Sequence, residues 1–182
     1  ATDTAAIVDP AWEVHEMLDF ADSKGIRITD ILLTHSHHDH INGLQQTLEH
    51  SDAQIHLLKP EAKFWGANLS KPAIHHGGDL IKVGESEINV LHTPGHTEGS
   101  ISLFDQSAGL LLSGDTLFFG GWGRTDLPGG DAEAMLDSLS RLRGLDPATR
   151  VIPGHGRETM IGTESAWIDN SIRTKSLTAD RS

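Results

Sequence analysis

Residues 34–40 read Thr34-His35-Ser36-His37-His38-Asp39-His40, and they decide how the rest of the chain is interpreted. An apolar run, Ile31–Leu33, precedes them, and a helix is predicted at residues 41–50. Alternate residues of an extended segment point the same way, so His35 and His37 can bind one ion together. Asp39 and His40 lie where the chain turns into the helix and can face a second ion. Imidazole and carboxylate are ligands that zinc accepts.

The alternative interpretation of this segment is an exposed polar loop or a tag-like histidine tract. Its position argues against that alternative, because a tag is seldom inserted between a buried strand and an amphipathic helix. The segment is therefore interpreted as part of a metal site.

Three further segments repeat the pattern of an apolar strand, a glycine turn and a ligand-type residue. They are Val90–His96 (VLHTPGH), Leu110–Asp115 (LLLSGD) and Val151–His155 (VIPGH). Each places His or Asp just past the carboxyl end of a strand, where open α/β sheets place their sites. Four such segments in 182 residues are hard to obtain by accident.

The hydrophobic pattern predicts strands alternating with helices. Strands are expected at residues 5–9, 26–33, 54–58, 80–83, 88–91, 101–104, 110–112 and 150–152, and helices at 11–24, 41–50, 132–143 and 164–172. Residues 59–78 are expected to form a loop with a helical turn, and residues 116–130 a long irregular loop. Because strands come in hairpins with helices interspersed, we expect an α/β layered architecture with mixed or antiparallel sheets rather than a purely parallel one.

Length and composition limit the function classes. The chain is expected to form a single domain over residues 1–182, with 174–182 as a frayed tail. A net charge of −12 disfavours a nucleic-acid partner, and no apolar stretch is long enough for a membrane helix. There is no cysteine, so disulfides and thiolate ligands are excluded, which is compatible with a cytoplasmic protein.

The order His35-x-His37-x-Asp39-His40, then His96, Asp115 and His155, resembles the metallo-β-lactamase superfamily over nearly the whole chain. The resemblance implies a four-layer αββα sandwich with a two-metal site at one edge. Related proteins usually carry strands before the segment equivalent to Ala5–Asp9, so the first amino-terminal strands are expected to be lacking here. The implied ligands are His35, His37 and His96 for one metal ion, Asp39, His40 and His155 for the second, and Asp115 bridging both.

Flanking sequence narrows the resemblance to one branch. Ser113–Phe118 (SGDTLF), Gly123–Asp131 (GRTDLPGGD) and Pro153–Gly156 (PGHG) are similar to bacterial glyoxalase II-like hydrolases, which resemble hydroxyacylglutathione hydrolases. The resemblance implies thioester hydrolysis by a metal-bound hydroxide at a dinuclear site. Two Zn²⁺ are the expected cofactors, and Fe²⁺ or a mixture of Zn, Fe and Mn is the alternative.

The chemistry is consistent with a thioester. Zinc lowers the pKa of bound water to about 7, and a thiol with a pKa near 8.5 leaves without a dedicated acid. A lactone or amide leaving group would need a proton, for which Asp39 is the candidate donor. The predicted catalytic residues are Asp39 and the bridging residue Asp115. Two Zn²⁺, two carboxylates and a hydroxide sum to a charge of about +1, which suits an anionic small-molecule substrate.

Several residues near the motifs allow two interpretations. Thr34 and Ser113 either orient the neighbouring ligands or make ordinary strand-end hydrogen bonds. Arg124 either binds a substrate carboxylate or pairs with Asp126. Trp122 either lines the pocket or packs the loop.

The histidines outside the motifs carry no predicted role. His75 and His76 are expected in a surface loop, and His56 is expected to be an ordinary histidine.

Other functions remain open from the sequence. A mononuclear iron-dependent persulfide dioxygenase would use His35, His96 and Asp115 alone. A lactonase and a non-catalytic member of the fold are further alternatives. The sequence does not distinguish iron from zinc, and it leaves the oligomeric state open.

Overall fold

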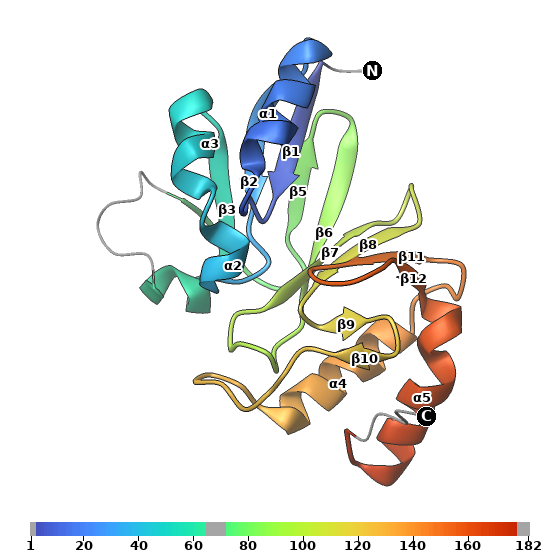
Figure 1. Ribbon diagram of the computed structural model, residues 1–182. Coiled ribbons are helices and arrows are strands. Elements are labelled where there is room, and N and C mark those ends of the chain that lie inside the picture. Colours follow the sequence, from blue (N-terminus) through green and yellow to red (C-terminus); the bar gives the residue numbers. More distant parts are fainter. Residues whose placement is uncertain (1–2, 65–71, 178–182) are drawn as a thin grey trace.

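The computed structural model describes residues 3–64 and 72–177. Two β-sheets face each other, and helices cover the outer face of each sheet (Figure 1). This confirms the four-layer αββα architecture expected from the sequence. In the part of the chain that is described, no helix combines the length and the apolar character needed to cross a bilayer.

The first sheet is built by the amino-terminal part of the chain. Its four strands pair in sequence order and all run parallel: β1 (Thr4–Val8), β2 (Arg27–Leu32), β3 (Gln54–Leu58) and β4 (Ala73–His75). Helices α1 (Val14–Ser23) and α3 (Leu44–His50) lie in the crossovers and cover the outer face. The expectation of only mixed or antiparallel sheets was therefore wrong here, because helical crossovers return each strand in the same direction.

The second sheet is mixed, as expected. Its strands lie in the order β12 (Thr159–Met160), β11 (Arg150–Pro153), β8 (Leu110–Gly114), β7 (Ile101–Asp105), β6 (Ser86–His92) and β5 (Leu80–Val83). Only β11 and β8 pair in parallel, and the other neighbours are antiparallel. Helices α4 (Ala132–Arg143) and α5 (Ile161–Thr174) pack on the outer face.

Three apolar cores lie between the four layers. Strand β2 shows how the sequence separates two of them, because successive side chains of a strand point to opposite faces. Ile31 packs with the residues beneath α1 and α3, whereas Leu32 joins Leu58 and Val90 between the two sheets. The third core lies beneath α4 and α5 and contains Leu111. Burying these side chains contributes about 25 cal/mol per Å² of apolar surface removed from water.

The predicted helix at 41–50 is interrupted. The structure has α2 (His38–Ile41), then Asn42 and Gly43, and then α3. A Cβ at Gly43 would lie 3.0 Å from the Cβ of Val14 and 3.1 Å from the carbonyl oxygen of Pro10. This close approach to the start of α1 is a tertiary constraint that the helical periodicity does not contain.

Other elements differ from the expected loops and boundaries. The loop expected at 59–78 contains a 3-10 helix, η1 (Lys59–Phe64), which agrees with the expected helical turn, and strand β4, which was not expected; residues 65–71 lie outside the described part. The predicted loop 116–130 contains the hairpin β9 (Leu117–Phe118) and β10 (Gly121–Trp122). Helix α5 extends to Thr174, and residues 178–182 of the expected frayed tail lie outside the described residues.

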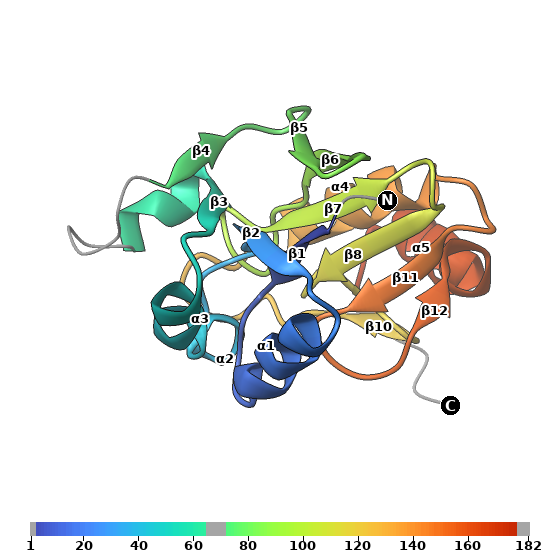
Figure 2. The same cartoon turned by 90° about the horizontal axis from the view of Figure 1, so that it is seen from above.

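Strand direction brings the ends of several strands to one edge of the sandwich. Strands β1 and β2 run parallel, and β8 runs parallel to β11. Strand β6 is separated from β8 by one antiparallel neighbour, β7, so β6 and β8 also run the same way. Figure 2, a view from above, shows β1 and β2 of the first sheet beside β8 of the second sheet, with β11 next to β8. The segments that follow these strands carry the predicted ligands.

Helix α4 begins with the cap that the sequence predicts. The carboxylate of Asp131 accepts hydrogen bonds from the backbone N–H groups of Glu133, at 2.8 Å, and Ala134, at 3.0 Å. Gly144 was expected just past the helix end, but it is the C-cap itself and has a right-handed φ of −75°.

We expect Asp131→Ala to lower the free energy of unfolding by about 1 kcal/mol, because two backbone donors lose their acceptor. Urea denaturation followed by circular dichroism measures the change. Asp137→Ala, at an exposed position of the same helix, is the matched control. Equal stability of the two variants would contradict a capping role for Asp131.

Candidate metal centre

The first group of predicted ligands gathers around His35, directly after β2. His35 is 1% exposed, and its ring lies 4.8 Å from that of His37 and 4.9 Å from that of His96, measured between centroids. His37 Nδ1 and His96 Nε2 are 2.8 Å apart. Each of the three side chains can direct one ring nitrogen to a common point, since these nitrogens lie within 4.8 Å of one another.

The second group lies beside the first and is more open to solvent. It combines Asp39 and His40 from α2 with His155 from the segment after β11. His155 Nε2 lies 3.2 Å from His40 Nε2 and 3.3 Å from Asp39 Oδ2. The side chain of His40 is 4% exposed, whereas those of Asp39 and His155 are 46% and 52% exposed. Solvent and small molecules can therefore approach this side of the site.

Asp115 lies between the two groups. Its Oδ2 is 3.4 Å from His96 Nε2 and 3.6 Å from His155 Nε2, and its Oδ1 is 3.4 Å from His40 Nε2. A single carboxylate thus approaches ligands of both groups, which is the position that a bridging residue needs. All seven predicted ligands are therefore brought together at one edge of the sandwich.

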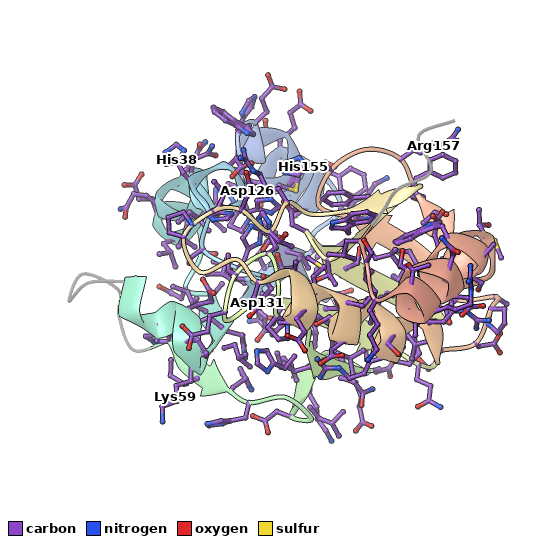
Figure 3. The ribbon with its side chains drawn as sticks, turned by 90° about the horizontal axis from the view of Figure 1, so that it is seen from below. His38, Lys59, Asp126, Asp131, His155 and Arg157 are labelled. Carbon is purple, nitrogen blue, oxygen red and sulfur yellow. The ribbon has the colours of Figure 1, made fainter. Side chains whose placement is uncertain are left out.

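His38 is the exception within the histidine motif. It is exposed and lies at the edge of the molecule, whereas His155 lies nearer the middle in the view of Figure 3. This agrees with the alternation that directs His38 away from His37.

Asp9 fixes the orientation of ligands in both groups. Its Oδ1 accepts from the backbone N–H of Thr34 at 2.7 Å, and its Oδ2 accepts from the Thr34 hydroxyl at 2.6 Å. The Thr34 oxygen lies 3.0 Å from His35 Nδ1, so it accepts the Nδ1 proton of His35. Asp9 Oδ2 also lies 2.9 Å from His40 Nδ1. One carboxylate thereby directs the Nε2 atoms of His35 and His40 into the site.

Asp9 was missed from the sequence, although a signal was present. It stands at the carboxyl end of the apolar strand β1, as the ligand residues do after their strands. It carries no neighbouring His or Asp, and it adopts a φ of +47° in the turn before Pro10. Thr34, by contrast, orients His35, which is one of the two roles considered for it.

Glu61 is a second buried residue that the sequence did not single out. It is 1% exposed, and its Oε1 accepts from the Thr97 hydroxyl at 2.8 Å and from the Gly99 N–H at 3.0 Å. Its Oε2 accepts from the Ser36 hydroxyl. Glu61 therefore ties the segment after β2 to the segment that carries His96. It lies in a stretch without periodicity, which gives no signal for this role.

The structure shows the contacts of the residues for which the sequence left two interpretations open. The guanidinium of Arg124 donates to both carboxylate oxygens of Asp126 and its side chain is 62% exposed, while its backbone carbonyl accepts from His96 Nδ1 at 2.7 Å. Ser113 donates to the carbonyl of Leu117, an ordinary backbone contact. Trp122 packs against Trp167, with ring centroids 5.6 Å apart. It also lines a cavity of about 980 Å³ together with Arg124.

A glycine allows the segment with His155 to approach the site. A Cβ at Gly154 would lie 2.3 Å from Asp115 Oδ1 and 2.7 Å from His40 Cε1. Any larger residue would therefore displace the ligands, which explains the glycine in the Pro153–Gly156 motif.

The pKa values of the site's histidines are shifted in opposite directions. Burial, together with the charge of His40, lowers the pKa of His35 to about 2. Burial also lowers the pKa of His37. Burial opposes protonation of His40 as well, but its contacts with Asp115 and Asp9 raise its pKa to about 10. The same contact with His40 outweighs burial and lowers the pKa of Asp115.

The donor atoms fit a metal ion. Nε2 of His35 is buried, and within residues 3–64 and 72–177 no hydrogen-bond donor or acceptor reaches it. An unpaired buried nitrogen costs on the order of 1–3 kcal/mol. In each group, moreover, two imidazole nitrogens face each other at 2.8 or 3.2 Å. A cation can replace the protons that such facing nitrogens otherwise share, and nitrogen with carboxylate oxygen is a donor set for zinc or iron.

We expect acid to destabilise the metal-free protein through His35. Unfolded His35 takes up a proton near pH 6.5, whereas folded His35 resists protonation down to about pH 2. Below pH 6.5 the unfolded chain thus binds more protons, and stability falls by about 1.4 kcal/mol per pH unit. His40 adds no slope there, since its raised pKa leaves it protonated in both states.

Urea denaturation of chelator-treated protein between pH 6 and pH 5 measures this slope. His35→Gln, which cannot titrate, should show a smaller slope by about 1.4 kcal/mol per pH unit. Identical slopes for the two proteins would show that His35 is protonated in the folded state.

Comparison with known proteins agrees with this geometry. The metallo-beta-lactamase superfamily model matches residues 1–155. A probable metallo-hydrolase, YqgX of Bacillus subtilis, is 39% identical over 89% of this chain and 84% of its own length. Hydroxyacylglutathione hydrolase GloC of Haemophilus influenzae is 32% identical over 88% of this chain and 84% of its own.

Solved structures show the same fold. BLEG-1, a B3 metallo-beta-lactamase, superimposes with a TM-score of 0.83 at 30% identity, covering 91% of this chain and 89% of its own. ETHE1 from Myxococcus xanthus superimposes with a TM-score of 0.84 at 32% identity, covering 97% of this chain and 79% of its own. TTHA1623, solved in a di-iron-bound form, superimposes with a TM-score of 0.76 at 35% identity, covering 87% of this chain and 85% of its own. The chain therefore belongs to the metallo-beta-lactamase superfamily.

Proposed function

We propose that the seven converging side chains hold two divalent metal ions. His35, His37 and His96 would hold one ion and Asp39, His40 and His155 the second, with Asp115 shared by both. The buried, unpartnered Nε2 of His35 and the facing imidazole nitrogens support this assignment. The ions are zinc or iron, since a polyketide-biosynthesis relative of Bacillus subtilis is called zinc-dependent and TTHA1623 was solved with two irons.

The protein is proposed to be a metal-dependent hydrolase that cleaves a thioester. The observation that carries this proposal is the complete second group, Asp39, His40 and His155, next to Asp115. Two such ions, when bound, supply an activated water at neutral pH and a Lewis acid for the carbonyl. The relatives that are called hydroxyacylglutathione hydrolases support the thioester class.

The chain's own residues prepare the site for this reaction. Asp9 and Thr34 hold Nδ1 of His35 and His40, which directs the Nε2 atoms inwards. Asp39 is half exposed and lies 3.3 Å from His155, so it can carry a proton between solvent and the leaving group. A thiolate, with a pKa near 8.5 for its thiol, leaves without that help, whereas an alkoxide needs it. An anionic thioester is the proposed substrate, because two divalent ions with two carboxylates and a hydroxide leave a net charge of about +1.

The second candidate is an iron-dependent persulfide dioxygenase. The iron in the structural relative TTHA1623, solved in a di-iron-bound form, favours an iron site, and this activity would need only His35, His96 and Asp115. Purified protein analysed for zinc and iron, then assayed with a thioester, a lactone and a persulfide with an oxygen electrode, separates the candidates. Thioester cleavage without oxygen uptake supports the hydrolase, and persulfide-dependent oxygen uptake contradicts it.

We expect Asp115→Asn to lower thioester turnover by at least about 100-fold, because one residue serves both groups of ligands. Elemental analysis of the same sample should show loss of bound metal. Asp19→Asn, at an exposed position of α1, is the control and should match the unaltered protein. Full turnover with both metals retained in Asp115→Asn would disprove the assignment.

We expect Asp9→Asn to weaken metal binding by about 10- to 100-fold, which is typical for the loss of a partner that orients a ligand. Competition with a chromophoric chelator measures the affinity. Asp3→Asn, at an exposed position near the start of the chain, should leave it unchanged. Wild-type affinity in Asp9→Asn would mean that His35 and His40 are oriented without this carboxylate.

A further inference from the structure

The carboxylate of Glu61 contacts the chain segment that carries two ligands of the first group. Its Oε2 accepts from the hydroxyl of Ser36, which lies between His35 and His37 in the sequence. Glu61 belongs to η1, so this contact is made across 25 positions of the chain. Because Ser36 is covalently joined to both histidines, a movement of Ser36 would move both of these ligands.

The other oxygen of Glu61 contacts the segment that carries the third ligand of the first group. Its Oε1 accepts from the hydroxyl of Thr97, the residue after His96, at 2.8 Å. The same oxygen accepts from the backbone N–H of Gly99 at 3.0 Å. The approach is close, because a Cβ at Gly99 would lie only 2.5 Å from Oε1. One carboxylate therefore sets the separation of the two segments that form the first group.

This arrangement distinguishes the first group of ligands from the second. Each ligand of the first group lies within one residue of a side chain that Glu61 holds, either Ser36 or Thr97. Among the ligands of the second group, the nearest to these two side chains in the sequence is Asp39, three residues after Ser36. Asp9, in contrast, orients one ligand of each group.

The charge of Glu61 also favours a cation in the first group. The residue is 1% exposed, and its three hydrogen-bond donors described above are neutral groups. A buried carboxylate is costly unless hydrogen bonds and a positive charge compensate for the lost water. Burial lowers the pKa of His37, and the charge of Glu61 is among the influences that oppose this shift. The field of Glu61 therefore reaches a ligand and favours positive charge there.

We propose that Glu61 is a positioning residue for the ion of the first group and does not act on the ion of the second. Its hydrogen bonds hold the segments of His35, His37 and His96 at one separation, and its negative charge attracts the ion that these ligands bind. This inference rests on the proposed function, because it requires metal ions among the seven ligands.

Variants that keep one complete group of ligands test this role. His155→Gln removes a ligand of the second group and keeps the first group complete, whereas His37→Gln does the reverse. Glu61→Gln is introduced into each background, and zinc affinity is measured by competition with a chromophoric chelator. We expect zinc to bind about 10- to 100-fold more weakly in the His155→Gln background and with unchanged affinity in the His37→Gln background.

The stability of the metal-free protein separates this role from a purely structural one. The amide of Glu61→Gln keeps an oxygen for Thr97 and Gly99, and its NH₂ group can donate to the hydroxyl oxygen of Ser36. The substitution also removes a buried charge. We therefore expect the urea midpoint of metal-free Glu61→Gln to equal or exceed that of the unaltered protein. A purely structural carboxylate would instead lower this midpoint and leave zinc affinity unchanged.

Ser36→Ala is a second test, because it keeps the carboxylate and removes one of its contacts. The two ligand segments are also joined by the backbone N–H of Ile101, which donates to the carbonyl of Thr34 at 2.9 Å. We therefore expect Ser36→Ala to fold, and to bind zinc at least about 10-fold more weakly in the His155→Gln background.

Glu16→Gln, at an exposed position of α1, is the matched control and should bind zinc like the unaltered protein. Unchanged zinc affinity in both Glu61→Gln and Ser36→Ala, or an equal loss in the two single-group backgrounds, would overturn the inference while leaving the metal centre in place. An unaltered protein that binds no zinc or iron would overturn the proposed function, and this inference with it.

Discussion

The hydrogen bonds of Asp9 are the interaction on which the metal centre depends. Through Thr34 this carboxylate fixes the proton of His35, and directly it fixes that of His40. It thereby connects one ligand of each group to the end of β1, which is itself paired with β2 in the first sheet. A buried imidazole such as His35 has two nitrogens and one proton, and its usefulness as a ligand depends on which nitrogen carries that proton.

Most of the ligand set could be predicted because its signals are local. His35, His96, Asp115 and His155 each follow an apolar run at a strand end, and the structure brings all of them to one edge. Asp9 and Glu61 were missed because their roles arise from residues that are distant in the sequence. Glu61, for instance, contacts segments 25 and 38 positions away.

The same distinction explains the errors in the fold. The order and approximate bounds of most strands follow from apolar runs and turn residues, but the pairing direction of β1 to β4 depends on how the crossover helices pack. The break between α2 and α3 lies at Asn42 and Gly43, where the chain passes close to Val14, and no local pattern encodes that approach. Strand β4 has only three residues and adjoins residues 65–71, so its alternation was too short to identify. His75, which was expected in a surface loop, lies in that strand, and its Nε2 is 2.9 Å from Nδ1 of His56.

The distribution of the ligands over the two sheets has a mechanical consequence. His35, His37, Asp39 and His40 follow the end of β2, whereas His96, Asp115 and His155 extend from strands of the opposite sheet. Ions held among them would link the two sheets at this edge of the sandwich, joining segments as far as 120 positions apart, from His35 to His155. The supply of metal would then determine how long a newly synthesised chain survives, because the metal-free protein unfolds more often and is then cleaved by proteases.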